Sequence, residues 1–398
     1  MLSTRFSLAR LAAPAALVAG LLLLAACSAG PSGSRVTDSG LAIDPNQPVR
    51  VALLVPLGSG DPGRDQLGRS LVNAAQLAQA DLQNATIELS VYHTGGTTDG
   101  GAAAASQAVA NGAQIIVGPL FSTATAGAQP VAAAAGLTVI SLSNNPEVAG
   151  QNVYILGNTF DNSADRLVAY GLSRGLRNFA VVYPDGLEGE TARNAVAGAV
   201  RGRGANFVGA EPYNLSVEGI QAAGASTAAT LISSGANAVI LTDGPTGGLT
   251  FMSEALRNNG LSSAQAQFLG LQRWDVSAEA LALPSLQGGA FAAPDPGPLA
   301  AFEGRYRNAY GEAPSAVAGY AYEAIAALGA LIAEARGSGG NPFTTARLTQ
   351  PSGFAGVNGA FRFLPNGLNQ RNLAIIEVRG GQAVVTERAP RSFTALAN

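Results

Sequence analysis

Short apolar segments alternate with helix-forming stretches along most of this chain, and this alternation restricts the possible fold more than any other feature. The first apolar segment is Val49–Val55, bounded by Pro48 and Pro56. An unbroken apolar strand is typical of a parallel sheet that is covered on both faces. Parallel strands joined by helices make right-handed crossovers, so the pattern predicts an α/β fold.

The alternation occurs twice, which predicts two α/β lobes, each a mainly parallel sheet flanked by helices. For the first lobe we expect strands at 49–55, 87–91, 115–117 and 137–140 and helices at 67–82, 101–111 and 122–135. For the second we expect strands at 179–183, 206–211, 238–242 and 267–271, with helices at 164–175, 190–203 and before 234 and 259. Two further helices, 299–310 and 315–335, precede antiparallel strands in the last part of the chain.

The beginning of the chain has the pattern of a secretory signal. Arg5 and Arg10 precede the apolar run 11–26, which ends in small residues before Cys27. The run is shorter than the roughly 20 residues that span a bilayer, and it contains Pro14 and Gly20. These features disfavour the alternative, an uncleaved membrane anchor.

Leu24-Ala25-Ala26-Cys27 resembles the lipobox of bacterial lipoproteins, in which the cysteine is acylated and becomes the first mature residue. The resemblance implies an exported, periplasmic protein held at the membrane by its lipid. Ser28, where an aspartate would imply retention in the inner membrane, favours the outer membrane. Residues 28–47 are rich in serine, glycine and proline and predict a flexible tether.

Charge and cysteine content exclude several classes of function. The chain has no lysine, a charged fraction of 12% and a net charge of −3, so we expect no nucleic-acid partner, which would require clustered cations. Cys27 is the only cysteine, which excludes an intramolecular disulfide.

Two motifs resemble enzyme signatures but lack the context that the chemistry requires. Gly58–Gly63 matches G-x-G-x-x-G, but Pro62 removes a backbone donor and no acid follows the second strand to bind a ribose. Gly171–Gly175 matches G-x-S-x-G, but here a helix precedes the motif and a strand follows it, the reverse of a nucleophile elbow. With His93 as the only histidine, we predict no catalytic residues, no cofactor and no metal site.

Small polar residues follow two neighbouring strands of the first predicted sheet. Ser122 and Thr123 come after one strand, and Ser143, Asn144 and Asn145 after the next. Both loops leave the carboxyl edge of a parallel sheet, where α/β proteins bind ligands, and a helix N-terminus there suits an anion. The alternative is that these residues only cap helices and form turns.

Residues 48–388 resemble the type 1 periplasmic-binding-protein fold of the leucine-binding-protein family. The segments that carry the resemblance are Val51–Leu57, Ile116–Leu120 with Ser122-Thr123, Val139–Ser141 with Asn145-Pro146, and Gly356–Phe363 with Asn366-Gly367. The resemblance implies two lobes joined by three chain crossings, near 157–158, 294–298 and 337–341. Lobe 1 would comprise 48–157 and 298–337, lobe 2 would comprise 158–297 and 338–388, and 389–398 would form a tail.

The resemblance also implies a ligand site between the lobes. In amino-acid-binding members, the loops that match Ser122-Thr123 and Ser143-Asn144-Asn145 hold the carboxylate, and lobe 2 supplies a tyrosine and an acid. Here Glu188 lies in the stretch that lacks the tyrosine, and Gln272 stands where the acid is expected, with Asp243 or Glu188 as substitutes. A buried ammonium needs a partner charge, so this pattern disfavours a simple zwitterion.

The lipobox together with Gly270–Asp275 is similar to a lipoprotein branch identified as penicillin-binding protein activators. This similarity implies a non-catalytic lipoprotein that contacts a peptidoglycan synthase. The alternative is a receptor that delivers an amino acid or similar small polar ligand to an ABC transporter.

Overall fold

The computed structural model describes residues 41–263 and 265–393. The predicted signal sequence, Cys27, most of the predicted tether and the end of the predicted tail lie outside the described residues. Within the described ranges, no helix combines the length and hydrophobicity needed to cross a bilayer.

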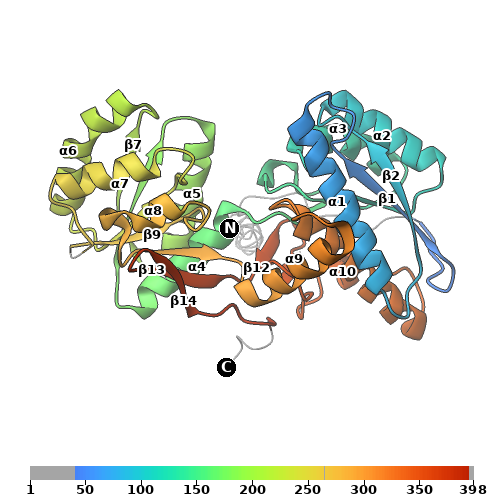
Figure 1. The fold of residues 1–398 in the computed structure, drawn as a ribbon. Coiled ribbons are helices and arrows are strands. Elements are labelled where there is room, and N and C mark those ends of the chain that lie inside the picture. Colours follow the sequence, from blue (N-terminus) through green and yellow to red (C-terminus); the bar gives the residue numbers. More distant parts are fainter. Residues whose placement is uncertain (1–40, 264, 394–398) are drawn as a thin grey trace, which may run out of the picture. The chain divides into compact units, whose positions relative to one another are not determined.

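Two sheets organise the chain, which confirms the predicted two-lobed α/β fold (Figure 1). The first sheet has the order β2-β1-β3-β4-β5 and is parallel throughout. Its strands are β1 (Val49–Val55), β2 (Ile87–His93), β3 (Ile115–Val117), β4 (Val139–Ser141) and β5 (Val153–Ile155). The helices between them are α1 (Pro62–Asp81), α2 (Thr98–Ala110), α3 (Ser122–Ala134) and the 3₁₀ turn η1 (Pro146–Val148).

The second sheet has the order β14-β13-β10-β9-β8-β6-β7, in which β13 runs antiparallel to both of its neighbours, β10 and β14, and the other pairs are parallel. Its strands are β6 (Asn178–Pro184), β7 (Asn206–Tyr213), β8 (Ala238–Leu241), β9 (Gln267–Gly270), β10 (Ala290–Ala293), β13 (Ala374–Arg379) and β14 (Gln382–Glu387). The associated helices are α4 (Phe160–Ser173), α5 (Leu187–Gly202), α6 (Val217–Ser233), α7 (Leu249–Asn258), α8 (Ala278–Ala282) and η2 (Pro284–Leu286).

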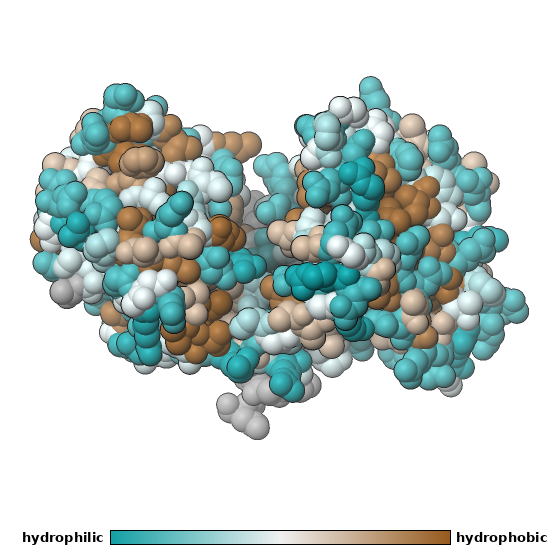
Figure 2. Space-filling model, viewed as in Figure 1, coloured by the Kyte–Doolittle hydropathy of each residue, from teal (hydrophilic) through white to brown (hydrophobic). Residues whose placement is uncertain are grey.

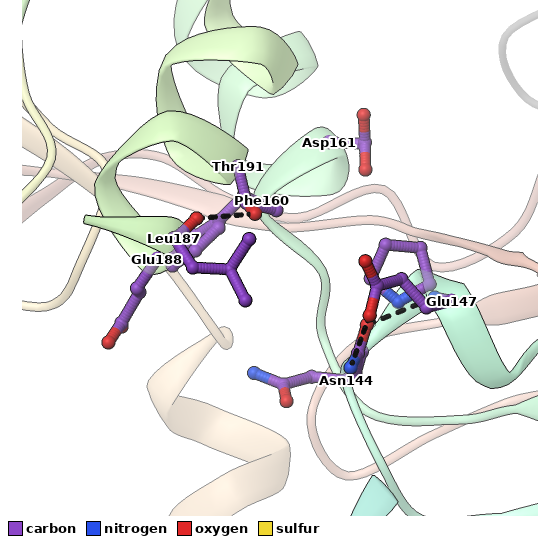
Figure 3. A pocket seen from close by; sticks show the side chains of 9 residues that line it. Asn144, Glu147, Phe160, Asp161, Leu187, Glu188 and Thr191 are labelled. Atoms are coloured by element: carbon purple, nitrogen blue, oxygen red, sulfur yellow. Dashed lines mark hydrogen bonds between the residues drawn. The ribbon is translucent and has the colours of Figure 1, made fainter. Parts of the chain in front are cut away.

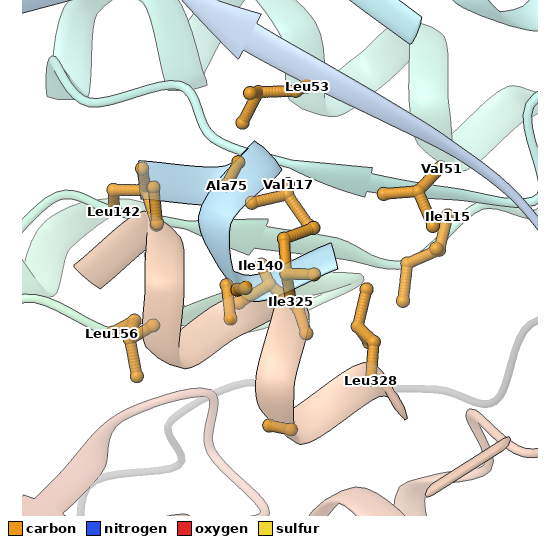
Figure 4. Close-up of a cluster of buried hydrophobic side chains, with 14 of the residues drawn as sticks. Val51, Leu53, Ala75, Ile115, Val117, Ile140, Leu142, Leu156, Ile325 and Leu328 are labelled. Carbon is orange, nitrogen blue, oxygen red and sulfur yellow. The ribbon is translucent and has the colours of Figure 1, made fainter. Parts of the chain in front are cut away.

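Helices cover both faces of each sheet, as the unbroken apolar strands require. In lobe 1, α1, α9 (Pro296–Tyr310) and α10 (Ala318–Ser338) pack on one face and α2 and α3 on the other. Figure 4 shows the first of these cores, where Leu53 and Val117 of the sheet lie near Ala75 of α1 and Ile325 of α10. In lobe 2, α4 and α5 cover one face and α6, α7 and α8 the other.

The chain changes lobe three times, and the third change differs from the expected position. The first two lie between Leu156 and Phe160 and between Ala293 and Pro296. The third lies between Arg371 and Ala374, some thirty residues after the expected 337–341. Segment 338–371, which was assigned to lobe 2 from the sequence, therefore belongs to lobe 1.

Aromatic burial explains this difference. The segment contains the short helix α11 (Thr345–Leu348) and a hairpin of β11 (Phe361–Phe363) and β12 (Asn369–Arg371). Its apolar side chains are buried in the core of lobe 1; they are Phe343, Leu348, Phe354, Phe361 and Phe363. The sequence pattern predicts antiparallel strands in this part of the chain, but neither β12 as the partner of β11 nor the core against which the hairpin packs.

A fully buried ion pair lies where the first and third crossings meet. Arg371 donates to Glu323 on α10 through both terminal nitrogens, at 2.9 and 3.1 Å. The same guanidinium donates to the carbonyl oxygens of Leu156 (3.0 Å) and Gly359 (3.1 Å). Glu323 also accepts from the backbone N–H of Asn358 at 2.6 Å. The pair thus connects α10, the first crossing and the final hairpin.

The start of the described chain is fixed to lobe 1. Ile43 is buried in its core, Arg336 donates to the carbonyl of Pro45 at 2.6 Å, and Asn341 donates to that of Leu41 at 2.9 Å. Leu41 borders a cavity with residues that precede β3 and β4, so the chain enters at the amino edge of the first sheet.

We predict that Arg371→Met lowers the free energy of unfolding by about 3–5 kcal/mol, because it leaves the Glu323 carboxylate buried without its partner. Arg203→Met is the matched control: it removes an exposed pair with Asp165 and should cost at most about 1 kcal/mol. Denaturant unfolding of both variants tests this. Equal losses of unfolding free energy in the two variants would show that the buried pair stabilises the protein no more than an exposed pair does.

Candidate functional site

A pocket of about 470 Å³ lies where loops from the carboxyl edges of both sheets come together. Lobe 1 contributes the loop after β4, and lobe 2 contributes the first turns of α4 and α5 (Figure 3). The residues that line it are Asn144, Asn145, Pro146, Glu147, Phe160, Asp161, Leu187, Glu188 and Thr191.

The lobe 1 wall is a loop held by its own side chains. The backbone N–H of Asn145 donates to Ser143 Oγ at 3.1 Å, and Asn145 Oδ1 accepts from the N–H of Glu147 at 3.0 Å. Asn145 therefore caps η1, as Asn commonly does at helix starts. Asn144 is exposed, and no hydrogen bond joins its side chain to another described residue.

The lobe 2 wall consists of two helix starts. Phe160 and Asp161 form the first turn of α4, directly after the first crossing. Shielding from water raises the pKa of the Asp161 carboxyl, and its own backbone N–H opposes this change. On α5, Thr191 Oγ1 donates to the carbonyl of Leu187 at 2.7 Å, which fixes the first turn.

Leu187 is unusually exposed for a leucine, at 77%. Other large exposed apolar side chains follow neighbouring strands of the same sheet edge; these are Leu215, Val217, Phe251 and Val276. Figure 2 shows apolar groups in brown among the polar surface of the visible face. The pocket therefore lies at an edge of lobe 2 that offers apolar contact.

Of the predicted site residues, the structure brings Asn144, Asn145 and Glu188 together in the pocket. Ser122 and Thr123 begin α3, outside the pocket lining, and Thr123 Oγ1 donates to the carbonyl of Gly96 at 3.0 Å. The buried hydroxyl of Ser143 accepts within its own loop.

Asp243 and Gln272 lie elsewhere and organise the loop after β8. The Asp243 carboxylate accepts from the N–H groups of Gly244 (2.9 Å) and Gly248 (2.5 Å) and from Tyr213 Oη (2.9 Å). Burial, reinforced by Asp243, raises the pKa of Tyr213. Gln272 donates to the carbonyl of Thr242 at 3.1 Å.

Sequence reasoning missed part of the lining, namely Pro146, Glu147, Phe160, Asp161, Leu187 and Thr191. Their place in the sequence could have indicated two of these residues. Phe160 and Asp161 begin a helix immediately after a predicted crossing, a position close to the boundary between the lobes. Leu187 and Glu188 occupy the stretch where related proteins were expected to place a tyrosine.

The enzyme-like motifs have structural roles. In Gly58–Gly63, the Asp61 carboxylate accepts from the N–H groups of Gly63 and Arg64, the donors that a pyrophosphate would need. Ser173 ends α4 and donates to the carbonyl of Tyr170. Across the described residues, no group of three or more His, Cys, Asp or Glu side chains is placed to hold a metal ion.

Comparison with known proteins identifies the family. The family model described as periplasmic binding protein matches residues 48–383, so the chain belongs to that family. Proteins of this family are periplasmic or otherwise extracytoplasmic, and they bind substrates rather than transform them. No curated protein matches the sequence.

Solved structures share the fold at low sequence identity. A structure from Rhodospirillum rubrum assigned to branched-chain amino acid ABC transport is 19% identical, with a TM-score of 0.70, and the match covers 85% of this chain and 100% of that one. An ABC transporter substrate-binding protein of Desulfitobacterium hafniense in complex with Leu is 19% identical, with a TM-score of 0.61. The match covers 85% of this chain and 100% of that one. A solute-binding protein of R. palustris in complex with benzoate is 16% identical, with a TM-score of 0.56. The match covers 87% of this chain and 97% of that one.

We predict that Asp243→Ala destabilises the protein by about 1–3 kcal/mol, because two backbone N–H groups and the Tyr213 hydroxyl lose their acceptor. Asp185→Ala is the control, since Asp185 is exposed and has no side-chain hydrogen bond to another described residue. Melting temperatures of the two variants give the comparison. An unchanged melting temperature in Asp243→Ala would show that Asp243 does not stabilise this loop.

Proposed function

We propose that this chain is a solute-binding receptor that delivers a small ligand to an ABC transporter. The observation that carries the proposal is the pocket of about 470 Å³ formed by loops of both lobes. This volume lies within the roughly 300–1,000 Å³ that is typical of small-molecule sites. The lining mixes amides, carboxylates and apolar side chains, which can orient a ligand but form no recognisable catalytic arrangement.

The structural relatives support this proposal. The Desulfitobacterium protein binds Leu and the R. palustris protein binds benzoate, so the fold accommodates small ligands of different charge. At this level of identity the ligand itself cannot be transferred, and the chemistry has to come from the pocket of this chain.

The activator function, which the sequence favoured, receives less support. The segment that suggested it, Gly270–Asp275, serves packing: Trp274 is fully buried beside Phe291, with ring centroids 5.7 Å apart. Arg273 pairs with Asp275 at 2.9 Å. Because Trp274 is not available to a partner protein, we place the receptor function first and protein contact with a peptidoglycan synthase second.

We also propose that Cys27 carries a lipid that holds the protein at the membrane, with the outer membrane favoured. Cys27→Ser should move the protein from the membrane fraction to the soluble fraction, because each buried methylene of an acyl chain contributes about 0.8 kcal/mol to binding. Immunoblots of fractionated cells measure this. Persistence of the serine variant in the membrane fraction would contradict lipid attachment at Cys27.

For ligand binding, we predict that Leu187→Trp fills the pocket and abolishes retention of a bound molecule with little effect on stability, because Leu187 is exposed. Leu215→Trp, at an exposed position on a neighbouring loop, is the matched control. Native mass spectrometry of protein purified from its host detects retained ligand directly. Thermal shifts with amino acids, amides, amines and aromatic acids extend the search, since ligand at 100 times its Kd adds about 2.7 kcal/mol.

If no ligand is retained and none stabilises the protein, while a peptidoglycan synthase co-purifies with it, the receptor function is wrong and the activator function is favoured. Equal ligand retention by wild type and Leu187→Trp would place the binding site elsewhere.

A further inference from the structure

The charges that line the pocket have one sign. Glu147 comes from lobe 1, and Asp161 and Glu188 come from lobe 2, so both walls contribute exposed acids to the lining, although the Glu188 side chain extends away from Asn144 (Figure 3). No arginine is among the lining residues, and the chain contains no lysine. Within the described residues, none of these three carboxylates forms an ion pair.

This arrangement differs from other acids of the same region. Glu190, two residues from Glu188 on α5, accepts from Tyr183 Oη at 3.2 Å and lies 3.8 Å from Arg193 Nε. Asp243 is saturated by three donors. Asp161 is exposed at the pocket and has no cationic partner among the described residues, and partial desolvation raises the pKa of its carboxyl.

Apolar side chains occupy the rest of the cavity wall. Phe160, Leu187 and Pro146 line it, and Leu187 in particular keeps 77% of its surface exposed. An apolar ligand portion that covers Leu187 would remove this surface from water, at about 25 cal/mol per Å². The pocket therefore pairs apolar contact with negative charge.

The two helix starts at the pocket are poorly suited to an anion. The start of α4 is capped by Thr159, which accepts from the N–H of Asn162. The start of α5 has no side-chain cap, but Glu188 and Glu190 in its first turn offset the partial positive charge. Ser122 and Thr123, which were expected to hold a carboxylate, are not part of the pocket.

We propose that the pocket selects a ligand with an ammonium or other cationic group next to an apolar portion, and that it rejects anions. This inference rests on the proposed receptor function and names the class of ligand. It also separates this chain from a receptor for free carboxylates, because the lining contains three acids and no cation.

Four compounds with a shared branched aliphatic chain test the charge preference by isothermal titration calorimetry: isoamylamine, L-leucinamide, L-leucine and 4-methylpentanoate. We expect binding of the two cations, weaker binding of the zwitterion, and at least about tenfold weaker or no binding of the anion, because unpaired carboxylates repel it. All titrations use the full chain at one ionic strength, since screening weakens such effects.

Matched variants connect the preference to the named residues. Glu188→Gln and Asp161→Asn should each weaken leucinamide binding by about tenfold or more, because each removes a charge-assisted hydrogen-bond acceptor. Glu190→Gln, which changes a neighbouring acid outside the pocket, should leave the affinity unchanged. Circular dichroism confirms that the variants are folded.

The outcomes separate this inference from the function beneath it. Binding of 4-methylpentanoate as strong as that of leucinamide, or an anionic molecule retained from the host, would overturn the ligand class and leave the receptor function intact. If none of the four compounds binds and the protein purified from its host carries no small molecule, the proposed receptor function itself is wrong. Loss of cation binding in Glu190→Gln equal to that in Glu188→Gln would also overturn the proposed site.

Discussion

The buried pair of Arg371 and Glu323 is the interaction on which the two-lobed arrangement depends. Charges removed from water need partners, and this pair is hydrogen-bonded to backbone groups from distant parts of the chain through both terminal nitrogens of Arg371 and through Glu323. Because Arg371 contacts the carbonyl of Leu156, it fixes the first crossing against the strand that leads into the third. A chain with this pair misplaced would leave two charges buried without partners.

The same junction determines where the pocket lies. Asn162, on the first turn of α4, accepts from the backbone N–H of Arg371 and donates to Asn369. Asn369 in turn donates to the carbonyls of Ile155 and Gly157. The start of α4 is thereby held beside the first crossing, and Phe160 and Asp161 reach the cavity from a fixed position. The candidate pocket therefore lies next to the part of the molecule that joins the lobes.

The sequence predicts the helices and strands that have a long hydrophobic pattern. It does not predict features that depend on how segments distant in the sequence pack together. The mainly apolar strands β1 and β6 and their flanking helices indicate the fold class. The short strands β5 and β10 were missed, whereas β3, which is equally short, was predicted from its run of Ile and Val. The third crossing was misplaced because burial of Phe361 and Phe363 against lobe 1 depends on the tertiary structure.

The candidate site shows the same division. Residues that follow strands were correctly located at the carboxyl edge, but their use was not predictable from residue type. Ser143 and Asp243 have the polar groups of a ligand site, yet backbone N–H groups already occupy them. Leu187, which has no polar group, lines the pocket because α5 begins there.

The point at which the chain enters lobe 1 has a mechanical consequence. Leu41 and Pro45 are fastened at the amino edge of the first sheet, whereas the pocket is formed by loops at the carboxyl edge. If Cys27 carries the proposed lipid, a pull transmitted through the chain would act on lobe 1, at the edge of its sheet opposite the pocket. An attachment at this end would therefore leave the pocket-lining loops of both lobes unrestrained by the anchor.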